Sequence, residues 1–257
     1  MKRKLLTRRQ FVFSALVGTP AAAVADSIWI EPDWLNVRRI RLTRNPPRHR
    51  FVHLTDIHHK GDRAYFEKVV NEINKLAPDF VCFTGDLIEE AKFLVESLEL
   101  LKKIRAPLYG CPGNHDYWAH VEFDEIAEAF ASTGGAWLMD GQAKTKDGNV
   151  TINGAATMNP PSIVPDPQTK NIMLIHYPEW VEKLEPHRFD VVLAGHTHGG
   201  QVRVPGYGAL VLPWGTGKYD LGMFKTEAGP LYVSSGVGWF ALNVRFCCRP
   251  EIVLFEM

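Results

Sequence analysis

The chain has 257 residues, of which 46% are hydrophobic and 23% charged, with 29 basic and 29 acidic side chains. This composition is that of a globular protein with one large domain, and it excludes a disordered or fibrous chain. The first 25 residues hold five of the basic side chains and no acid, so the remainder is mildly acidic. The surplus of acidic side chains after residue 25 argues against nucleic acid as a partner, because binding to its phosphate backbone requires basic surfaces.

The N-terminus has the pattern of a targeting segment. Arg8 and Arg9 precede an apolar run that ends in the small-residue triplet 23–25. A basic start, a short apolar middle and a small-residue end predict a twin-arginine signal peptide over residues 1–25, with the Tat export machinery as a partner. The same residues could form an uncleaved N-terminal anchor with peripheral membrane contact. We favour cleavage and export to the periplasm or cell envelope, with residues 26–36 as a linker and 37–257 as one domain.

Alternating strand and helix patterns occupy the first half of that domain. An apolar run at 51–56 predicts a strand, and apolar residues at helical spacing predict a helix over 63–76. A second strand over 78–86, a second helix over 89–104 and a third strand over 106–116 follow. This βαβαβ order is typical of an α/β fold with a parallel sheet and helical crossovers.

The second half is richer in strands and contains two long loops. The predicted strands cover residues 149–155, 171–176, 189–196, 200–204, 229–236 and 251–256. A proline-rich stretch over 158–168 predicts an extended loop, and the glycine- and aromatic-rich stretch over 205–224 predicts a second one. Long ordered loops of the second kind often line a functional site.

Polar residues with metal-binding chemistry collect where predicted strands end. They are Asp56 and His58; Asp86; Asn114, His115 and Asp116; His176; and His196 and His198. Because loops at the carboxyl ends of strands converge on one crevice of an open α/β sheet, we expect these side chains to meet. Carboxylate, imidazole and amide groups are ligands for Mn, Fe(II), Zn or Co. One carboxylate can bridge two cations about 3.5–4 Å apart, an arrangement that suits attack on a phosphate.

The order of these motifs resembles that of the calcineurin-like metallophosphoesterases. The series D-x-H, G-D, G-N-H-[DE], a lone His and G-H-x-H is present intact, and the resemblance runs from about residue 37 to the C-terminus. The segments GHTHGGQ (195–201) and SSGVG (234–238) look most like a bacterial branch that is often Tat-exported or membrane-associated. That branch also includes UDP-2,3-diacylglucosamine hydrolases of lipid A biosynthesis. The resemblance implies a four-layer αββα sandwich of two mixed β-sheets flanked by helices.

The resemblance also implies roles for the site residues. One metal would be held by Asp56, His58 and His198, and a second by Asn114, His176 and His196, with Asp86 bridging both. Of the two divalent ions Mn is favoured, and a metal-bound hydroxide would attack the phosphorus. His115 would contact the phosphate and protonate the leaving oxygen, while Asp116 would orient His115.

Three further points concern residues near these motifs. Glu89 stands where purple acid phosphatases have a tyrosine ligand, so a ferric-tyrosinate site is not expected. Trp214, Tyr219 and Phe224 in the long loop could contact an apolar part of the substrate, or could simply pack that loop down. We include Trp214 and Tyr219 among the expected substrate-binding residues.

The predicted function is therefore metal-dependent hydrolysis of phosphate mono- or diester, or pyrophosphate, bonds of a phosphorylated small molecule or lipid-linked substrate. A narrower alternative is UDP-2,3-diacylglucosamine pyrophosphate hydrolysis. An alternative of another class is a non-catalytic interaction scaffold on the same fold, which the intact motif set disfavours.

Overall fold

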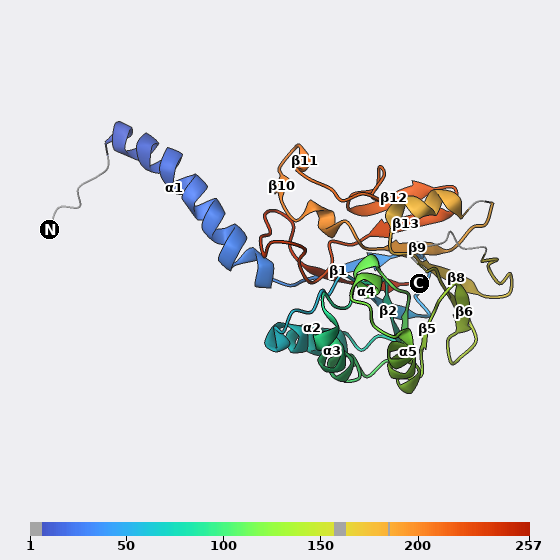
Figure 1. Cartoon of the computed structure of the whole chain (residues 1–257). Helices are drawn as coiled ribbons and strands as arrows, with labels where there is room; N and C mark the ends of the chain where they lie inside the picture. Colours follow the sequence, from blue (N-terminus) through green and yellow to red (C-terminus); the bar gives the residue numbers. More distant parts are fainter. Residues whose placement is uncertain (1–6, 157–162, 185) are drawn as a thin grey trace.

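The computed structural model describes residues 7–156, 163–184 and 186–257, which form two mixed six-stranded sheets packed face to face (Figure 1). The first six residues of the predicted signal and the first part of the predicted 158–168 loop lie outside the described residues. The expected α/β fold with two mixed sheets is confirmed.

The first sheet carries the βαβαβ half of the chain. Its strands, in spatial order, are β1 (Asn36–Arg41), β14 (Glu251–Glu256), β2 (Arg50–Leu54), β3 (Phe80–Phe83), β4 (Leu108–Gly110) and β5 (Ala136–Trp137). Strands β2 to β5 run parallel, as the crossovers predict, whereas β14 pairs antiparallel with β2 and parallel with β1. Strand β1 was not among the predicted strands.

The second sheet, also mixed and six-stranded, is built from the second half of the chain. Its order is β12 (Gly222–Thr226), β13 (Gly229–Val233), β9 (Val191–Ala194), β8 (Lys170–Leu174), β7 (Val150–Gly154) and β6 (Gly141–Lys144). The four inner strands are parallel and the two outer ones antiparallel. A short hairpin of β10 (Arg203–Val204) and β11 (Gly208–Ala209) stands apart at the start of the 205–224 loop.

Helices α2 (Arg63–Leu76), α3 (Leu94–Leu101) and α5 (Phe123–Ser132) cover the outer face of the first sheet (Figure 1). Helix α2 has the predicted bounds, because Asp62 caps it by accepting a hydrogen bond from the Tyr65 amide at 3.0 Å. The helix predicted over 89–104 is shorter, since its first part is the 3-10 turn η2 (Ala91–Phe93).

Three apolar clusters hold the layers together. Between the sheets, Phe51 stacks on Phe80 and on Phe255 with ring centroids 5.2 and 5.0 Å apart. On the outer face of the second sheet, Trp180 of η3 (Pro178–Lys183) and Leu184, which follows this helix, pack against strand residues such as Val192. Among the described residues, the helix of this fourth layer is therefore a 3-10 helix, where the αββα expectation has α-helices.

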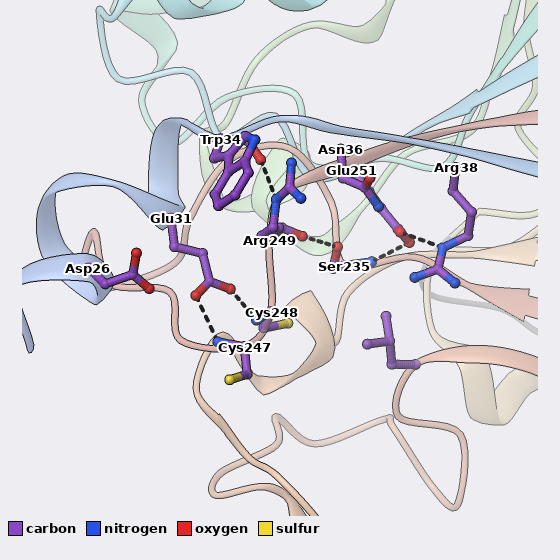
Figure 2. Close-up of a pocket in the computed structure, with 11 residues that line it drawn as sticks. Asp26, Glu31, Trp34, Asn36, Arg38, Ser235, Cys247, Cys248, Arg249 and Glu251 are labelled. Carbon is purple, nitrogen blue, oxygen red and sulfur yellow. Dashed lines mark hydrogen bonds and ion pairs between the residues drawn. The ribbon is translucent and has the colours of Figure 1, made fainter. Parts of the chain in front are cut away.

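Helix α1 (Arg8–Trp29) projects from the body and runs through the predicted cleavage point at Ala25 (Figure 1). Within the described ranges, no helix combines the length and apolar character needed to cross a membrane. The predicted linker 26–36 is packed rather than free. Ser27 accepts a hydrogen bond from the Arg245 amide at 2.9 Å, and buried Glu31 accepts from the amides of Cys247, at 2.8 Å, and Cys248 (Figure 2).

Candidate metal centre

Five strand ends from both sheets meet at the predicted site. In the first sheet Asp56, Asp86 and Asn114 follow β2, β3 and β4, and in the second His176 and His196 follow β8 and β9. The carboxyl ends of the parallel strands of the two sheets therefore share one edge of the sandwich. The structure brings all seven expected ligands to this edge, and six of them are buried, with His196 partly exposed.

One group of ligand atoms joins the D-x-H loop to the G-H-x-H loop. Potential ligand atoms of Asp56, His58 and His198 all lie within 4.8 Å of one another. His198 Nε2 is 3.0 Å from His58 Nε2 and 3.7 Å from Asp56 Oδ1. These three side chains converge on a single point, as a metal site requires.

A second group lies beside the first and shares Asp86 with it. Potential ligand atoms of Asp86, His176 and His196 lie within 4.8 Å of one another, and Asn114 Oδ1 is 2.9 Å from His176 Nε2. Asp86 Oδ2 is 3.2 Å from His176 Nε2 and 3.4 Å from His58 Nε2. One carboxylate oxygen thus faces both groups, which is the position of a bridging ligand.

The chemistry of these donors fits divalent cations. Asp56 and Asp86 are buried, and the ion pairs they make among the described residues are with imidazoles alone. Buried carboxylates without a cation are costly. The Nε2 atoms of His58 and His198 also face each other at 3.0 Å, and a cation between them would bind both lone pairs. We conclude that the residues present fit a pair of metal ions.

The pKa values of Asp86 and His176 reflect the interaction between the buried carboxylates and the imidazoles of the centre. Burial alone would raise the pKa of Asp86, but the imidazoles of His176 and His58 outweigh it and hold that pKa well below its usual range. Burial opposes protonation of His176, yet the nearby carboxylates of Asp86 and Asp56 raise its pKa to about 9. The carboxylates of the centre therefore attract positive charge.

The backbone at the ligands is strained. Asp56, His58, Asp86, His196 and His198 all have φ between 44° and 69°, in the left-handed region that non-glycine residues seldom occupy. Each such residue costs of order 1–3 kcal/mol, and strain of this kind collects at functional sites because the surrounding structure enforces it. Two backbone hydrogen bonds help to hold this conformation. The amide of Asp56 donates to the carbonyl of Gly85, and the amide of His58 donates to the carbonyl of Asp86, both at 3.0 Å.

Glycines beside the ligands permit close approach of the chain. A Cβ atom on Gly195 would collide with Thr55 and with the carboxylate of Asp56, and one on Gly113 would collide with Asp86. Gly236 presses on Asp56 in the same way from the 234–238 segment. These contacts explain why the ligand motifs contain glycine at positions where no side chain fits.

Glu89, rather than Asp116, orients His115. Glu89 Oε2 lies 2.6 Å from His115 Nδ1, and Oε1 lies 3.1 Å from His58 Nδ1. The carboxylate of Asp116 accepts hydrogen bonds from the amides of Asp86, Leu87 and Gly113 at 2.8–2.9 Å. Our expectation for Asp116 is corrected accordingly: its carboxylate binds three backbone N–H groups and ties the G-D loop to the G-N-H-D loop.

A cleft of about 560 Å³ opens beside the centre. Trp214 and Tyr219, expected to bind substrate, do not line it. The Trp214 ring is exposed, while its carbonyl oxygen lies 2.6 Å from His196 Nε2. Tyr219 is buried, donates its hydroxyl to Glu182 at 3.1 Å and packs edge-on against Phe224 at 5.2 Å. For Tyr219 the structure therefore gives the packing role.

Three residues at the site were assigned no role from the sequence. Glu89 entered the sequence analysis only because it replaces the tyrosine ligand of purple acid phosphatases, and Gln201 and Phe240 were given no role there. Gln201 is the last residue of the GHTHGGQ segment, which was a usable signal, whereas Phe240 reaches the site from a loop that shares no local motif with it. Lys60 supports this loop, because its Nζ donates to the Trp239 carbonyl at 2.7 Å and pairs with Glu89 at 3.1 Å.

Comparison with known proteins gives matching results. A family model described as calcineurin-like phosphoesterase matches residues 49–200, more than half of the chain. The chain is 27% identical to the uncharacterized metallophosphoesterase YkuE of Bacillus subtilis, covering 99% of this chain and 98% of that protein. It is 28% identical to the UDP-2,3-diacylglucosamine pyrophosphatase LpxG of Chlamydia trachomatis (95% and 97% covered). It is 25% identical to the phosphodiesterase YaeI of Escherichia coli (98% and 100% covered).

Proposed function

We propose, since this chain belongs to the calcineurin-like phosphoesterase family and is a metal-dependent phosphoester hydrolase, that two divalent cations share the carboxylate of Asp86. The observation that carries the proposal is the position of Asp86 Oδ2 between His58 and His176. The interaction scaffold weighed above is set aside, because the chain is a hydrolase of this family with its buried His and Asp clusters intact.

The remaining ligands divide between the two positions. Asp56, His58 and His198 would hold one cation, and Asn114, His176 and His196 the other. Such a pair of cations, when bound, neutralises charge on phosphoryl oxygens and activates water. Mn is the cation we favour for a mixed imidazole, carboxylate and amide set.

His115 acts as the general acid in this proposal. Its Nδ1 faces Glu89, so the ring is held with Nε2 free to meet a substrate oxygen. Burial lowers the pKa of His115, but the hydrogen bond to Glu89 and the charge of Asp86 outweigh burial and raise it above its ordinary value. The raised pKa favours the protonated ring, which is the form that a general acid requires.

The substrate is a phosphate mono- or diester or a pyrophosphate. A second candidate, UDP-2,3-diacylglucosamine pyrophosphate hydrolysis, is favoured by the full-length similarity to LpxG. The described residues that line the cleft include no lysine or arginine, however, so a second phosphate group beyond the reach of the cations would meet no basic side chain there.

We also propose that the protein is exported by the Tat route to the periplasm or cell envelope, with residues 1–25 as its signal or as an uncleaved anchor. The paired Arg8 and Arg9 and the following apolar run support this proposal. The packing of Ser27 and Glu31 on the domain is compatible with either outcome. Determining the N-terminal residue of the mature protein decides between them, because cleavage after Ala25 would expose Asp26.

One panel of assays tests the activity. Protein loaded with Mn is offered p-nitrophenyl phosphate, bis-p-nitrophenyl phosphate, UDP-2,3-diacylglucosamine and phosphatidic acid, and the same sample is analysed for bound metal. We expect turnover of a monoester or diester that is lost on chelation and restored by Mn. Turnover of the UDP lipid alone would narrow the function to the second candidate, and no turnover of any substrate would refute both.

A further inference from the structure

The cleft beside the metal centre has one polar side and one apolar side. The polar side is formed by the centre itself, including His58, His115 and His198. The apolar side comes from two loops, residues 210–213 and 240–244, which present aliphatic and aromatic groups. The organic group of a phosphoester bound at the centre would therefore lie next to a hydrocarbon surface.

Gln201 fixes one of the two apolar loops, residues 240–244, relative to the proposed ligands. Its Nε2 donates to the carbonyl oxygens of Leu242 at 2.9 Å and Val244 at 3.2 Å, and its Oε1 accepts from the Phe240 amide at 2.6 Å. Gln201 follows His198 by three residues, so the segment that supplies two metal ligands also holds the wall of the cleft. The apolar wall is thus a built part of the site.

The wall is exposed and lacks permanent positive charge. Val211 is 75% exposed and Leu242 is 69% exposed, although both lie at the mouth of a cleft. Covering such surface with hydrocarbon is favourable, in proportion to the apolar area removed from water. With no lysine or arginine among the described residues that line it, the cleft favours a neutral chain over a second anionic group.

The general acid stands on the apolar side of the centre. The ring centroid of His115 lies 4.7 Å from that of Trp118 and 5.3 Å from that of Phe240. The oxygen that His115 protonates therefore departs next to Phe240. This arrangement directs the leaving group, rather than the retained part of the phosphate, into the cleft.

We propose that the substrate is an amphiphilic phosphoester whose leaving alcohol carries a hydrocarbon chain, and that this chain lies in the cleft. The inference rests on the proposed function and specifies its substrate class. The oxygen of a water molecule bonds to phosphorus, the bond from phosphorus to the leaving oxygen breaks, and the proton of His115 passes to that oxygen. The products are a long-chain alcohol and the phosphate, and a proton of the water restores His115.

The position of α1 favours a lipid bilayer as the source of the chain. The end of this helix is joined to the cleft loop by the hydrogen bond from the Arg245 amide to the Ser27 carbonyl. Apolar side chains beyond the predicted cleavage point are exposed, among them Trp29 at 73% and Ile30 at 53%. Exposed apolar side chains at the end of the helix are therefore linked to the apolar cleft mouth through Arg245 and Val244, as binding of both at one lipid surface would require.

The test uses n-alkyl monophosphates from ethyl to decyl, as dissolved monomers, with the full Mn-loaded chain. We expect kcat/KM to rise about two- to fourfold per added CH₂ group, the gain for burying a methylene. The double variant Val211→Ser with Leu242→Ser should flatten this slope, and Gln201→Ala should weaken it by releasing the wall. Val95→Ser is the matched control, because Val95 is 64% exposed on α3 outside the cleft, and it should keep the slope.

Three outcomes would overturn the inference. A wild-type slope near zero would show that no chain binds, and an unchanged slope in the double variant would show that it binds elsewhere. In either case turnover of p-nitrophenyl phosphate would leave the proposed function intact. No turnover of any substrate would overturn that function and the inference with it. A parallel arm offers phosphatidic acid in phosphatidylcholine vesicles, and phosphate release there supports the inference and identifies a bilayer as the source.

Discussion

Glu89 holds the ring of His115 through a 2.6 Å contact between Oε2 and Nδ1, while its other oxygen contacts His58. One carboxylate therefore positions both a proposed metal ligand and the proposed acid. Replacement of an outer carboxylate of this kind typically costs 10–100-fold in metal affinity or activity.

We predict that Glu89→Ala lowers kcat by about 10–100-fold, with partial recovery in Glu89→Gln. The loss should be larger for an alkyl phosphate than for p-nitrophenyl phosphate, because nitrophenolate leaves without help from an acid. Glu90→Ala is the control, since Glu90 is exposed and pairs with Lys92. An equal loss for both leaving groups would reduce Glu89 to a structural residue.

His115→Asn should separate catalysis from metal binding. We expect kcat to fall by about 10²–10⁴-fold, the usual contribution of a general acid, while the bound metal per chain is unchanged. His120→Asn is the comparison, because His120 is an exposed histidine outside the cleft. If His115→Asn also emptied the metal positions, its ring would have to be counted among the ligands.

Asp86→Asn should remove metal from both positions, because the variant loses the one negative charge that both groups share. Asn114→Ala, by contrast, should release only the second cation. Metal content measured by mass spectrometry after dialysis distinguishes these results, and Asp147→Asn serves as a variant of the same chemistry remote from the centre. Retention of two metals in Asp86→Asn would contradict a bridging role.

His53 predicts a pH dependence of folding stability. This buried ring lies 2.8 Å from the Thr84 hydroxyl, and burial lowers its pKa from 6.5 to about 3. At a pH between these two pKa values, His53 binds a proton in the unfolded chain but not in the folded protein. The free energy of unfolding should therefore fall on acidification from about pH 6.5, by up to about 1.4 kcal/mol per pH unit.

His53→Gln should remove that part of the slope. The measurement is urea unfolding of metal-free wild type and variant between neutral pH and the acid limit of folding. We expect the stability difference between the two proteins to shift in favour of the variant as the pH falls. Parallel curves would mean that the buried ring accepts a proton in the folded state.

The sequence predicted those features that depend on local pattern. Helix α2 has its predicted bounds because its apolar spacing and its Asp62 cap lie within the helix and next to it. The expected ligand side chains could be singled out because each follows an apolar strand run, and the structure brings them together. The shortened second helix and the 3-10 fourth layer depend on tertiary packing, which overrides local propensity.

Other features depend on partners far away in the chain. Strand β1 carries three arginines, is largely exposed and pairs with β14, more than 200 residues later. The role of Glu89 depends on His115, which is 26 residues away, and that of Phe240 depends on Gln201. Helix α5 is different, because its apolar stripe of Ile126, Ala129 and Phe130 was a readable signal that the prediction omitted.

The place of β14 between β1 and β2 sets an order of events during synthesis. Strand β2 leads directly into Asp56, yet its neighbour β14 emerges from the ribosome only after the chain has grown past every ligand. A nascent chain that already contains all seven proposed ligands still lacks the strand beside the D-x-H loop. The cations should therefore bind only after residues 251–256 have left the exit tunnel. A growing chain that is halted before that point would bind the cations poorly.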